Sequence, residues 1–351
     1  MQTDLFFHKS FLSHSMSEGH PERPERLLYT MSLLQDQGIL DYDSLEIMEP
    51  TSAQPEDIHP VHSLEYLSML KEKSQMGGGY FTLDTMANEH TYTAAMLAAG
   101  ASVAGVDRQM SGASQNGFVL CRPPGHHAEY ERAFGFCFIN NIGVAAMRLI
   151  RKWDLSRIMI IDYDAHHGNG TQNTFYSTDR VLYVGLHQNG RTLFPGSGFV
   201  DEMGVGQGQG YTLNLPLTPQ AGDPTYHLLF DEIIEPLSER YKPEFVLVSA
   251  GFDAHHRDSL TNLGMTLAGL ALINERIQSI ADEYSSGRSL YFLEGGYELE
   301  VLGNGILNVI QNLLGMEVTQ YESMGQEPRH CTDESKELVK LVRERFGGIL
   351  F

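Results

Sequence analysis

The chain has 351 residues and a formal net charge of −21. This acidity argues against direct nucleic-acid binding, which needs basic surface, and favours cationic substrates or basic partner proteins. The three cysteines form no CxxC pair and no disulfide framework, so a bound metal would have to be held by histidine and carboxylate.

Short β-rich runs alternate with helix-like stretches, and runs such as IMII and FVLVSA are continuously apolar, as in strands buried on both faces. The predicted strands are Asp4–Phe7, Leu45–Met48, Phe118–Cys121, Ile158–Asp162, Leu182–Leu186, Thr212–Leu215, Phe245–Ala250 and Leu290–Leu293. The predicted helices are Pro24–Gln37, Thr91–Met110, Asn141–Trp153, Tyr226–Arg240, Leu267–Glu283 and Leu299–Leu314. This alternation predicts an α/β fold, with a parallel sheet wrapped by helices.

We expect one domain over residues 1–351, with a core over residues 1–315 and a polar tail over residues 316–351 that ends in a helix, Lys336–Phe346. No apolar run is long enough to span a bilayer. The first residues, MQTDLFFHKS, lack the basic stretch and long apolar core of a signal peptide. We therefore expect a cytoplasmic protein, or a nuclear one if the source is eukaryotic.

Polar side chains gather directly after the predicted strands. They lie in the segments RPPGHH (122–127), DYDAHHGNG (162–170), GFD (251–253) and EGGY (294–297), and His187 ends a further strand. The carboxyl ends of parallel strands open on one edge of the sheet, and ligands bind there. Residues far apart in the sequence are therefore expected to converge on one site.

A metal site is predicted within this cluster. Asp164 and His166 are two residues apart at a strand end, where alternate side chains point the same way, and Asp253 can supply a third ligand from another strand end. Two carboxylates and one imidazole leave a position for water, which is the open arrangement of a catalytic site. Zn²⁺ suits this ligand set best, with Fe²⁺ or Co²⁺ as substitutes.

Acid–base chemistry is predicted for the adjacent His126 and His127, because imidazole gains and loses protons near neutral pH. Asp162 is placed to orient one ring and Asn169 the other, and such partners set the tautomer and the basicity. Tyr297 follows two glycines after a strand. Its phenol can therefore approach the metal and donate a hydrogen bond to the oxyanion of a tetrahedral intermediate.

These motifs resemble the histone deacetylase family, and most closely its class II branch and the bacterial deacetylase-like amidohydrolases. The matching segments are HPERPERL (20–27), RPPGHHAEYERAFGFCFINN (122–141), IIDYDAHHGNGTQ (160–172), VGLHQ (184–188), FPGSG (194–198), SAGFDAH (249–255) and LEGGY (293–297). The resemblance implies an arginase-like three-layer fold with a central eight-stranded parallel sheet. It also implies a zinc-dependent amidohydrolase that removes acetyl or other acyl groups from lysine side chains.

Residue roles follow from the same resemblance. One zinc ion would be held by Asp164, His166 and Asp253, His126 and His127 would be the general acid/base pair backed by Asp162 and Asn169, and Tyr297 would polarise the acyl carbonyl. A narrow acyl-lysine channel would be lined by Gly135, Phe136, Phe194 and Leu260, with Arg26 at its inner end.

The resemblance further implies one or two structural potassium ions, held mostly by backbone carbonyls. The first site would use Asp162, Asp164, His166, Gly185 and Leu186, and the second would use Phe175, Thr178, Val181 and Tyr211. Family members commonly have a Ser where this chain has Gly185, so one side-chain oxygen is missing from the first site.

Other interpretations stay open. Acetylpolyamine is the alternative substrate: polyamine-selective relatives have an acidic gatekeeper where Leu260 aligns, whereas the net acidity of this chain favours a cation. A catalytically silent acyl-lysine binding module is a lower-ranked alternative. Dinuclear manganese ureohydrolases belong to the wider superfamily, but Gly168 and His255 stand where their second-metal carboxylates would be. The tail is compatible with a packed helix or with a contact in a homo-oligomer.

Overall fold

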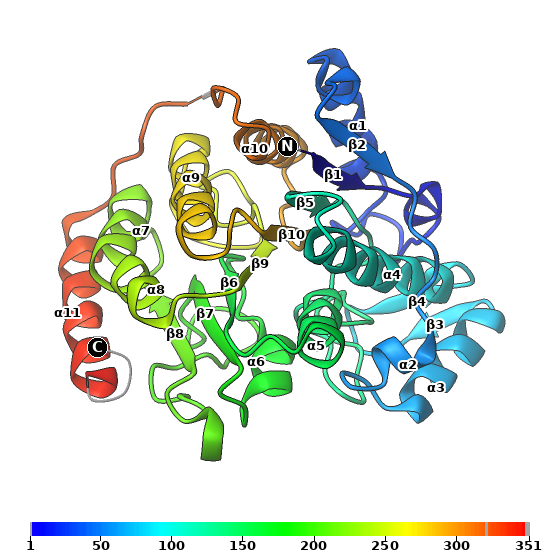
Figure 1. The fold of residues 1–351 in the computed structure, drawn as a ribbon, viewed down its shortest axis with the longest axis horizontal. Helices are drawn as coiled ribbons and strands as arrows, with labels where there is room; N and C mark the ends of the chain where they lie inside the picture. Colours follow the sequence, from blue (N-terminus) through cyan, green and yellow to red (C-terminus); the bar gives the residue numbers. More distant parts are fainter. Residues whose placement is uncertain (1, 320–321, 348–351) are drawn as a thin grey trace.

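An eight-stranded parallel sheet forms the centre of the computed structural model, which describes residues 2–319 and 322–347 (Figure 1). The strand order is β2-β1-β5-β10-β9-β6-β7-β8. The strands are β1 (Thr3–Phe6), β2 (Leu45–Met48), β5 (Asn116–Val119), β6 (Ile158–Asp162), β7 (Val181–Gln188), β8 (Thr212–Leu217), β9 (Phe245–Ala250) and β10 (Ser289–Leu293). Each predicted strand overlaps one of these eight, so the predicted α/β class and sheet are confirmed.

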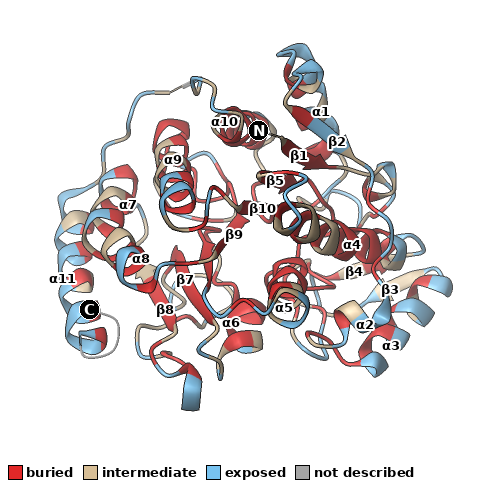
Figure 2. Ribbon diagram, viewed as in Figure 1, coloured by how far each residue is buried: buried red, intermediate tan, exposed pale blue. Residues whose placement is uncertain are grey.

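Helices cover both faces of the sheet. On one side α4 (Thr91–Met110) packs on α5 (Asn141–Trp153), and on the other α10 (Leu299–Leu313) packs on α1 (Glu25–Asp36) and α9 (Leu267–Tyr284). Members of both groups contact β5 and β9, which places the sheet between two helical layers. Every residue of β6, β9 and β10 is buried (Figure 2), as expected for strands covered on both faces.

One predicted helix contains an irregular turn. The predicted helix Tyr226–Arg240 consists of α7 (Asp223–Leu229), a π-helical turn η4 (Phe230–Ile234) and α8 (Glu235–Tyr241). The backbone N–H of Glu235 donates to the carbonyl of Phe230, five residues back. Pro236 follows and has no N–H to donate, so the regular hydrogen-bond ladder cannot continue through this position.

Several short elements were not predicted. They are the helices α2 (Pro55–Ile58), α3 (Leu64–Gln75) and α6 (Asn169–Phe175), the 3₁₀ turns η1 (Lys9–Leu12), η2 (Ile39–Asp41) and η3 (Gly206–Gly208), and the antiparallel strands β3 (Gly78–Tyr80) and β4 (Met86–Asn88). The hairpin depends on glycine, because a Cβ on Gly78 would lie 2.1 Å from the carbonyl oxygen of Ala87.

The C-terminal helix α11 (Arg329–Phe346) begins earlier than predicted and packs against α7, at the far end of the molecule from α4 (Figure 1). Its buried residues Cys331, Val339, Val342 and Phe346 join the main hydrophobic core. The hydroxyls of Ser335 and Thr225 lie 2.7 Å apart across this contact. Within the described ranges no helix has the length and apolarity that a bilayer span requires.

Candidate active site

The carboxyl ends of β5, β6, β9 and β10 bring the predicted site residues together. Asp162 at the end of β6 pairs in register with Ser249 on β9 and with Gly185 on β7. The segments that follow β6, β9 and β10 carry Asp164, Asp253 and Tyr297. The sheet therefore collects side chains more than a hundred residues apart at one edge, as the strand-end argument predicts.

Asp164, His166 and Asp253 form a group able to hold a metal ion. The Nδ1 atom of His166 lies 2.9 Å from Oδ2 of Asp253 and 3.2 Å from Oδ1 of Asp164. The remaining carboxylate oxygens accept backbone N–H groups, Asp164 from Gly295 and Asp253 from Ala165. One oxygen of each carboxylate is thus fixed by the backbone, while the other faces the imidazole, and Oδ1 of Asp164 also accepts the backbone N–H of His166.

The charges at this group fit a cation. The Asp164 and Asp253 side chains are 1% and 0% exposed. Burial and the neighbouring charge of Asp164 raise the pKa of Asp253. Burial also opposes ionisation of Asp164, but His126 and His166 outweigh it and hold the pKa of that carboxyl well below its usual range. A divalent ion would relieve the repulsion between the two carboxylates, and two oxygens with one imidazole suit Zn²⁺.

His126 and His127 lie beside this group with their rings 4.0 Å apart, centroid to centroid. Nδ1 of His126 is 3.1 Å from Oδ2 of Asp162, and Nδ1 of His127 is 2.8 Å from Oδ1 of Asn169. The structure thus brings each imidazole to the partner predicted from the sequence. Both residues also line the cavity described below.

The different partners separate the pKa values of the two histidines. Burial favours the neutral form of His126, but Asp162, Glu294 and Asp164 outweigh it and raise its pKa to about 10. Burial lowers the pKa of His127 well below its usual value, and positive charge on His126 and His166 lowers it further. Two titratable groups driven in opposite directions are typical of acid–base pairs, and here His127 is the neutral imidazole and His126 the cationic one.

Two glutamates that the sequence reasoning missed support this pair. Glu294 is fully buried and accepts the backbone N–H groups of Gly125 and His126, at 2.7 and 3.1 Å. Glu129 accepts from Nδ2 of Asn169 at 2.7 Å, which fixes the amide with its oxygen toward His127. Both lie within segments that carried the family resemblance, but they have no spacing signature of their own.

A cavity of about 190 Å³ leads to the metal group. Its lining includes the predicted channel residues Gly135, Phe136, Phe194 and Leu260, together with His126, His127, Asp164, His166 and Tyr297. It also includes Asp84, Pro124, Cys137, Leu193 and Gly295, which were not predicted. Its walls thus combine aromatic and aliphatic side chains with polar side chains, which include two members of the metal-binding group.

Tyr297 and Arg26 are stacked at one wall of this site. The Arg26 guanidinium carbon lies 5.0 Å from the centroid of the Tyr297 ring. Arg26 is fully buried and is not among the residues that line the cavity; it donates to Glu22 and to the carbonyls of Glu294 and Gly296. Burial raises the pKa of the Tyr297 phenol well above its usual value, so the hydroxyl stays a hydrogen-bond donor.

Glycines make room for the reactive side chains. A Cβ on Gly135 would lie 2.3 Å from Cδ2 of His127, and one on Gly295 would lie 2.4 Å from Oδ2 of Asp253. Gly135 also has a φ of +53°, a conformation that L side chains rarely adopt. Both glycines lie in segments that carry the family resemblance, Gly135 between two phenylalanines and Gly295 in EGGY.

The two predicted potassium sites lie at opposite ends of β7. Gly185 and Leu186 lie near its carboxyl end beside Asp162, whereas Val181 begins the strand and Tyr211 lies beside it through the N–H of Tyr183. Phe175 ends α6 and its carbonyl accepts the N–H of Thr178. A Cβ on Gly185 would lie 2.8 Å from the Tyr183 hydroxyl, which therefore occupies the space of the side chain that is missing there.

Comparisons with known proteins place the chain in a family. The histone deacetylase domain family matches residues 20–313. A probable deacetylase of Archaeoglobus fulgidus is 40% identical over 320 residues, covering 91% of this chain and 88% of the relative. A histone deacetylase-like amidohydrolase of Pseudomonas aeruginosa is 34% identical over 298 residues, covering 85% and 78%. The crystal structure of the HDA15 HD domain superposes with a TM-score of 0.88 at 34% identity, covering 98% of this chain and 96% of the other.

The chain therefore belongs to the histone deacetylase family, and it shares the arginase-like fold of that family. Membership makes it a hydrolase that acts on amides. The predicted family, fold and enzyme class are confirmed.

Proposed function

We propose that this chain is a zinc-dependent amidohydrolase that removes acetyl or other acyl groups from lysine side chains of proteins and peptides. The observation that carries the proposal is that two members of the metal-binding group, Asp164 and His166, line a cavity whose walls include Phe136 and Phe194. An extended aliphatic side chain with an acyl amide at its tip fits such a cavity.

Zinc bound by Asp164, His166 and Asp253 would act as a Lewis acid toward the acyl carbonyl and would make water acidic enough to attack near neutral pH; Fe²⁺ or Co²⁺ are possible substitutes. The ligand set fits this role because two buried carboxylates face the imidazole of His166. The cationic His126 lies beside them, with its Nε2 atom 3.9 Å from Oδ1 of Asp164.

The chain's own residues would carry the proton transfers. His127, held neutral, accepts a proton through Nε2 as water attacks the acyl carbon. The Tyr297 hydroxyl donates a hydrogen bond to the developing oxyanion. His127, helped by the cationic His126, then returns a proton to the leaving amine. Asp162 and Asn169 hold the two rings through their Nδ1 atoms throughout.

Acetylpolyamine is the second candidate substrate, and Asp84 is the observation that favours it. This carboxylate lines the cavity that Leu260 also lines, so it could bind a cationic amine beyond the acyl group. Leu260 itself is apolar and favours acyl-lysine.

Potassium at the two carbonyl sites, a cytoplasmic or nuclear location and a homo-oligomeric state remain predictions from the sequence.

The proposal is tested by measuring kcat/KM on acetyl-lysine peptides, longer acyl-lysine peptides and acetylpolyamines, each with and without a chelator. Chelator-sensitive hydrolysis of acyl-lysine peptides, restored by Zn²⁺, is the expected result. A preference for acetylpolyamine would select the second candidate. A zinc-loaded protein that hydrolyses none of these substrates would contradict the proposal and favour a silent binding module.

A further inference from the structure

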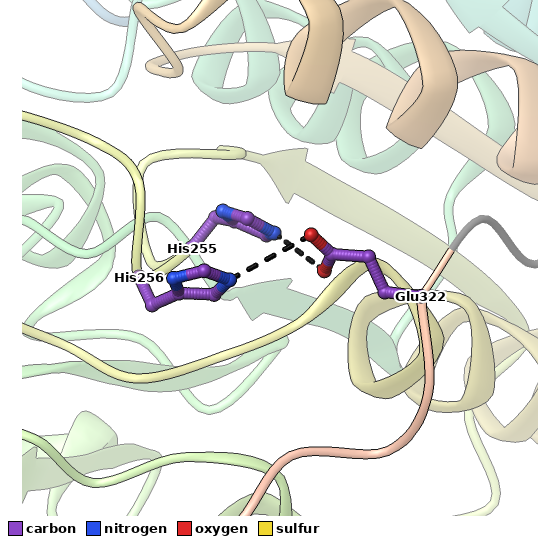
Figure 3. Close-up of side chains that lie close together, drawn as sticks. All are labelled: His255, His256 and Glu322. Carbon is purple, nitrogen blue, oxygen red and sulfur yellow. Dashed lines mark hydrogen bonds and ion pairs between the residues drawn. The ribbon is translucent and has the colours of Figure 1, made fainter.

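A second cluster of potential metal ligands lies outside the acyl cavity. His255 and His256 lie in the loop after β9, and Glu322 comes from the segment between α10 and α11, 67 residues away from His255 (Figure 3). Nε2 of His255 is 2.9 Å from Oε2 of Glu322, and Nε2 of His256 is 3.6 Å from Oε1. Both imidazoles therefore face the same carboxylate (Figure 3).

Packing and hydrogen bonds hold the three side chains of this cluster in place. The two rings lie 4.4 Å apart, centroid to centroid, with an angle of 30° between their planes. Oε2 of Glu322 also accepts the backbone N–H of Leu267 at the start of α9, at 3.0 Å. This contact fixes the carboxylate and leaves Oε1 directed at His256, so one donor atom from each of the three side chains lies within 4.8 Å of the others.

The position of the cluster allows an ion to reach it. The His255 side chain is fully buried, whereas the side chains of His256 and Glu322 are 49% and 23% exposed. Two imidazoles and one carboxylate are the donors that Zn²⁺, Co²⁺ and Ni²⁺ prefer, while Mg²⁺ and Ca²⁺ need more oxygens. Three protein donors leave at least one position for water.

We propose that His255, His256 and Glu322 form a second binding site for a divalent transition-metal ion, with Zn²⁺ as the physiological candidate. Bound metal would join the loop that carries Asp253 to the segment that leads into α11. Because no cavity residue takes part, the ion would have a structural role, and the site does not depend on the reaction in the acyl cavity.

The second site should be weaker than the first. Nδ1 of His255 accepts the backbone N–H of Arg257 at 3.1 Å, so the neutral ring carries its proton on Nε2 and donates it to Glu322. A metal ion can bind Nε2 of His255 only when the ring proton sits on Nδ1 instead. The Arg257 N–H must then donate to water rather than to Nδ1, and water can reach it because the contact is only partly buried. Among the described residues, the metal-facing atoms of the Asp164 group contact one another and, at 3.9 Å from Oδ1 of Asp164, Nε2 of His126, and no backbone N–H holds the imidazole of His166 in the wrong tautomer.

Metal content tests the site directly. The full chain without a histidine tag is dialysed against buffered Zn²⁺, and zinc per chain is measured by elemental analysis. The wild-type protein should hold two zinc ions per chain, of which a mild chelator removes one first. His256→Ala and Glu322→Gln should each hold one. His59→Ala removes another exposed histidine outside the cluster and should hold two.

Thermal unfolding gives a second measurement on the same proteins. Raising Zn²⁺ beyond one equivalent should raise the Tm of the wild-type and His59→Ala proteins but not that of His256→Ala, since only ligand binding to the folded state stabilises it. The proposal is overturned if the wild-type protein holds a single zinc ion, or if His256→Ala and Glu322→Gln retain both ions and the second-equivalent Tm shift.

Discussion

The Nδ1 atom of His127 lies 2.8 Å from the amide oxygen of Asn169. An amide oxygen accepts a hydrogen bond without carrying a full charge, so it holds the proton on Nδ1 and leaves Nε2 as a free base. Glu129 keeps the amide in this orientation by accepting from its NH₂ group. A carboxylate in place of the amide would stabilise the imidazolium, as Asp162 does for the neighbouring His126.

Asn169→Asp is therefore expected to raise the pKa of His127. Since the base must be neutral, the acid limb of the kcat/KM pH profile should move to higher pH by about 1 unit. Asn173→Asp adds the same charge to α6 at an exposed position that also contacts Glu129 but not His127, and its profile should match the wild type. An unchanged acid limb in Asn169→Asp would contradict the role of His127 as the base.

Tyr297→Phe is expected to lower kcat by roughly 10²–10³-fold, the scale of one lost oxyanion donor. KM should change little, because the phenyl ring keeps its packing against Arg26 and Phe136. The comparison is made on an acetyl-lysine peptide at saturating zinc, with Tm as a check on folding. A near-normal kcat would remove Tyr297 from the oxyanion site.

Gly135→Ala should displace the His127 ring and leave the metal ligands in place. The new Cβ would lie 2.3 Å from the His127 ring, and a reactive group misplaced by about 1 Å can reduce the rate by roughly 10²-fold. Gly206→Ala is the matched control, because Gly206 also has a positive φ, +58°, but nothing lies within 4 Å of its Cβ position. Equal kcat values for the two variants would show that the strained backbone, rather than the contact with His127, matters.

Acid should destabilise the fold partly through His62, which is fully buried and accepts the N–H of Asn140 on Nε2. Burial lowers its pKa to about 4, whereas the unfolded chain binds a proton below pH 6.5. The neutral ring's contribution is thus present above pH 6.5 and is lost as the pH falls toward 4. By linkage, the free energy of unfolding drops by roughly 2 kcal/mol between pH 7.5 and pH 5 from this residue.

Urea unfolding at pH 7.5 and pH 5 checks this contribution. His62→Gln should show a smaller drop in the free energy of unfolding than the wild type, whatever its stability at pH 7.5. His59→Gln, at an exposed position, should keep the full drop. An identical pH dependence in His62→Gln and the wild type would assign the acid sensitivity to other groups.

The centre of the sheet was predictable because strands such as β6, β9 and β10 are short, largely apolar runs, as expected for strands buried on both faces. Helix α3 was missed because polar and apolar residues such as Lys71 and Leu70 alternate without a sharp boundary, and the β3–β4 hairpin was missed because its pairing depends on the close approach at Gly78. The helix Tyr226–Arg240 was predicted to run through Pro236, and the π-helical turn that precedes this proline is seen only in the structure.

The candidate site was predictable where its residues form motifs at strand ends, as Asp164 and His166 do. Residues that act through tertiary contact leave no such trace. Glu129 and Glu294 contact the histidine pair only after the chain folds, and Asp84 reaches the cavity from the β3–β4 hairpin. Glu322 meets His255 across 67 positions of sequence, which no local spacing could indicate.

The most direct test of the account is the rate of acetyl-lysine peptide hydrolysis as Zn²⁺ is added stepwise to chelator-stripped protein. The stripped protein should be inactive, and the rate should rise linearly and saturate at one equivalent bound to Asp164, His166 and Asp253, with no further gain as the second site fills. Full activity in the stripped protein, or none after zinc loading, would contradict the proposed zinc-dependent deacylation.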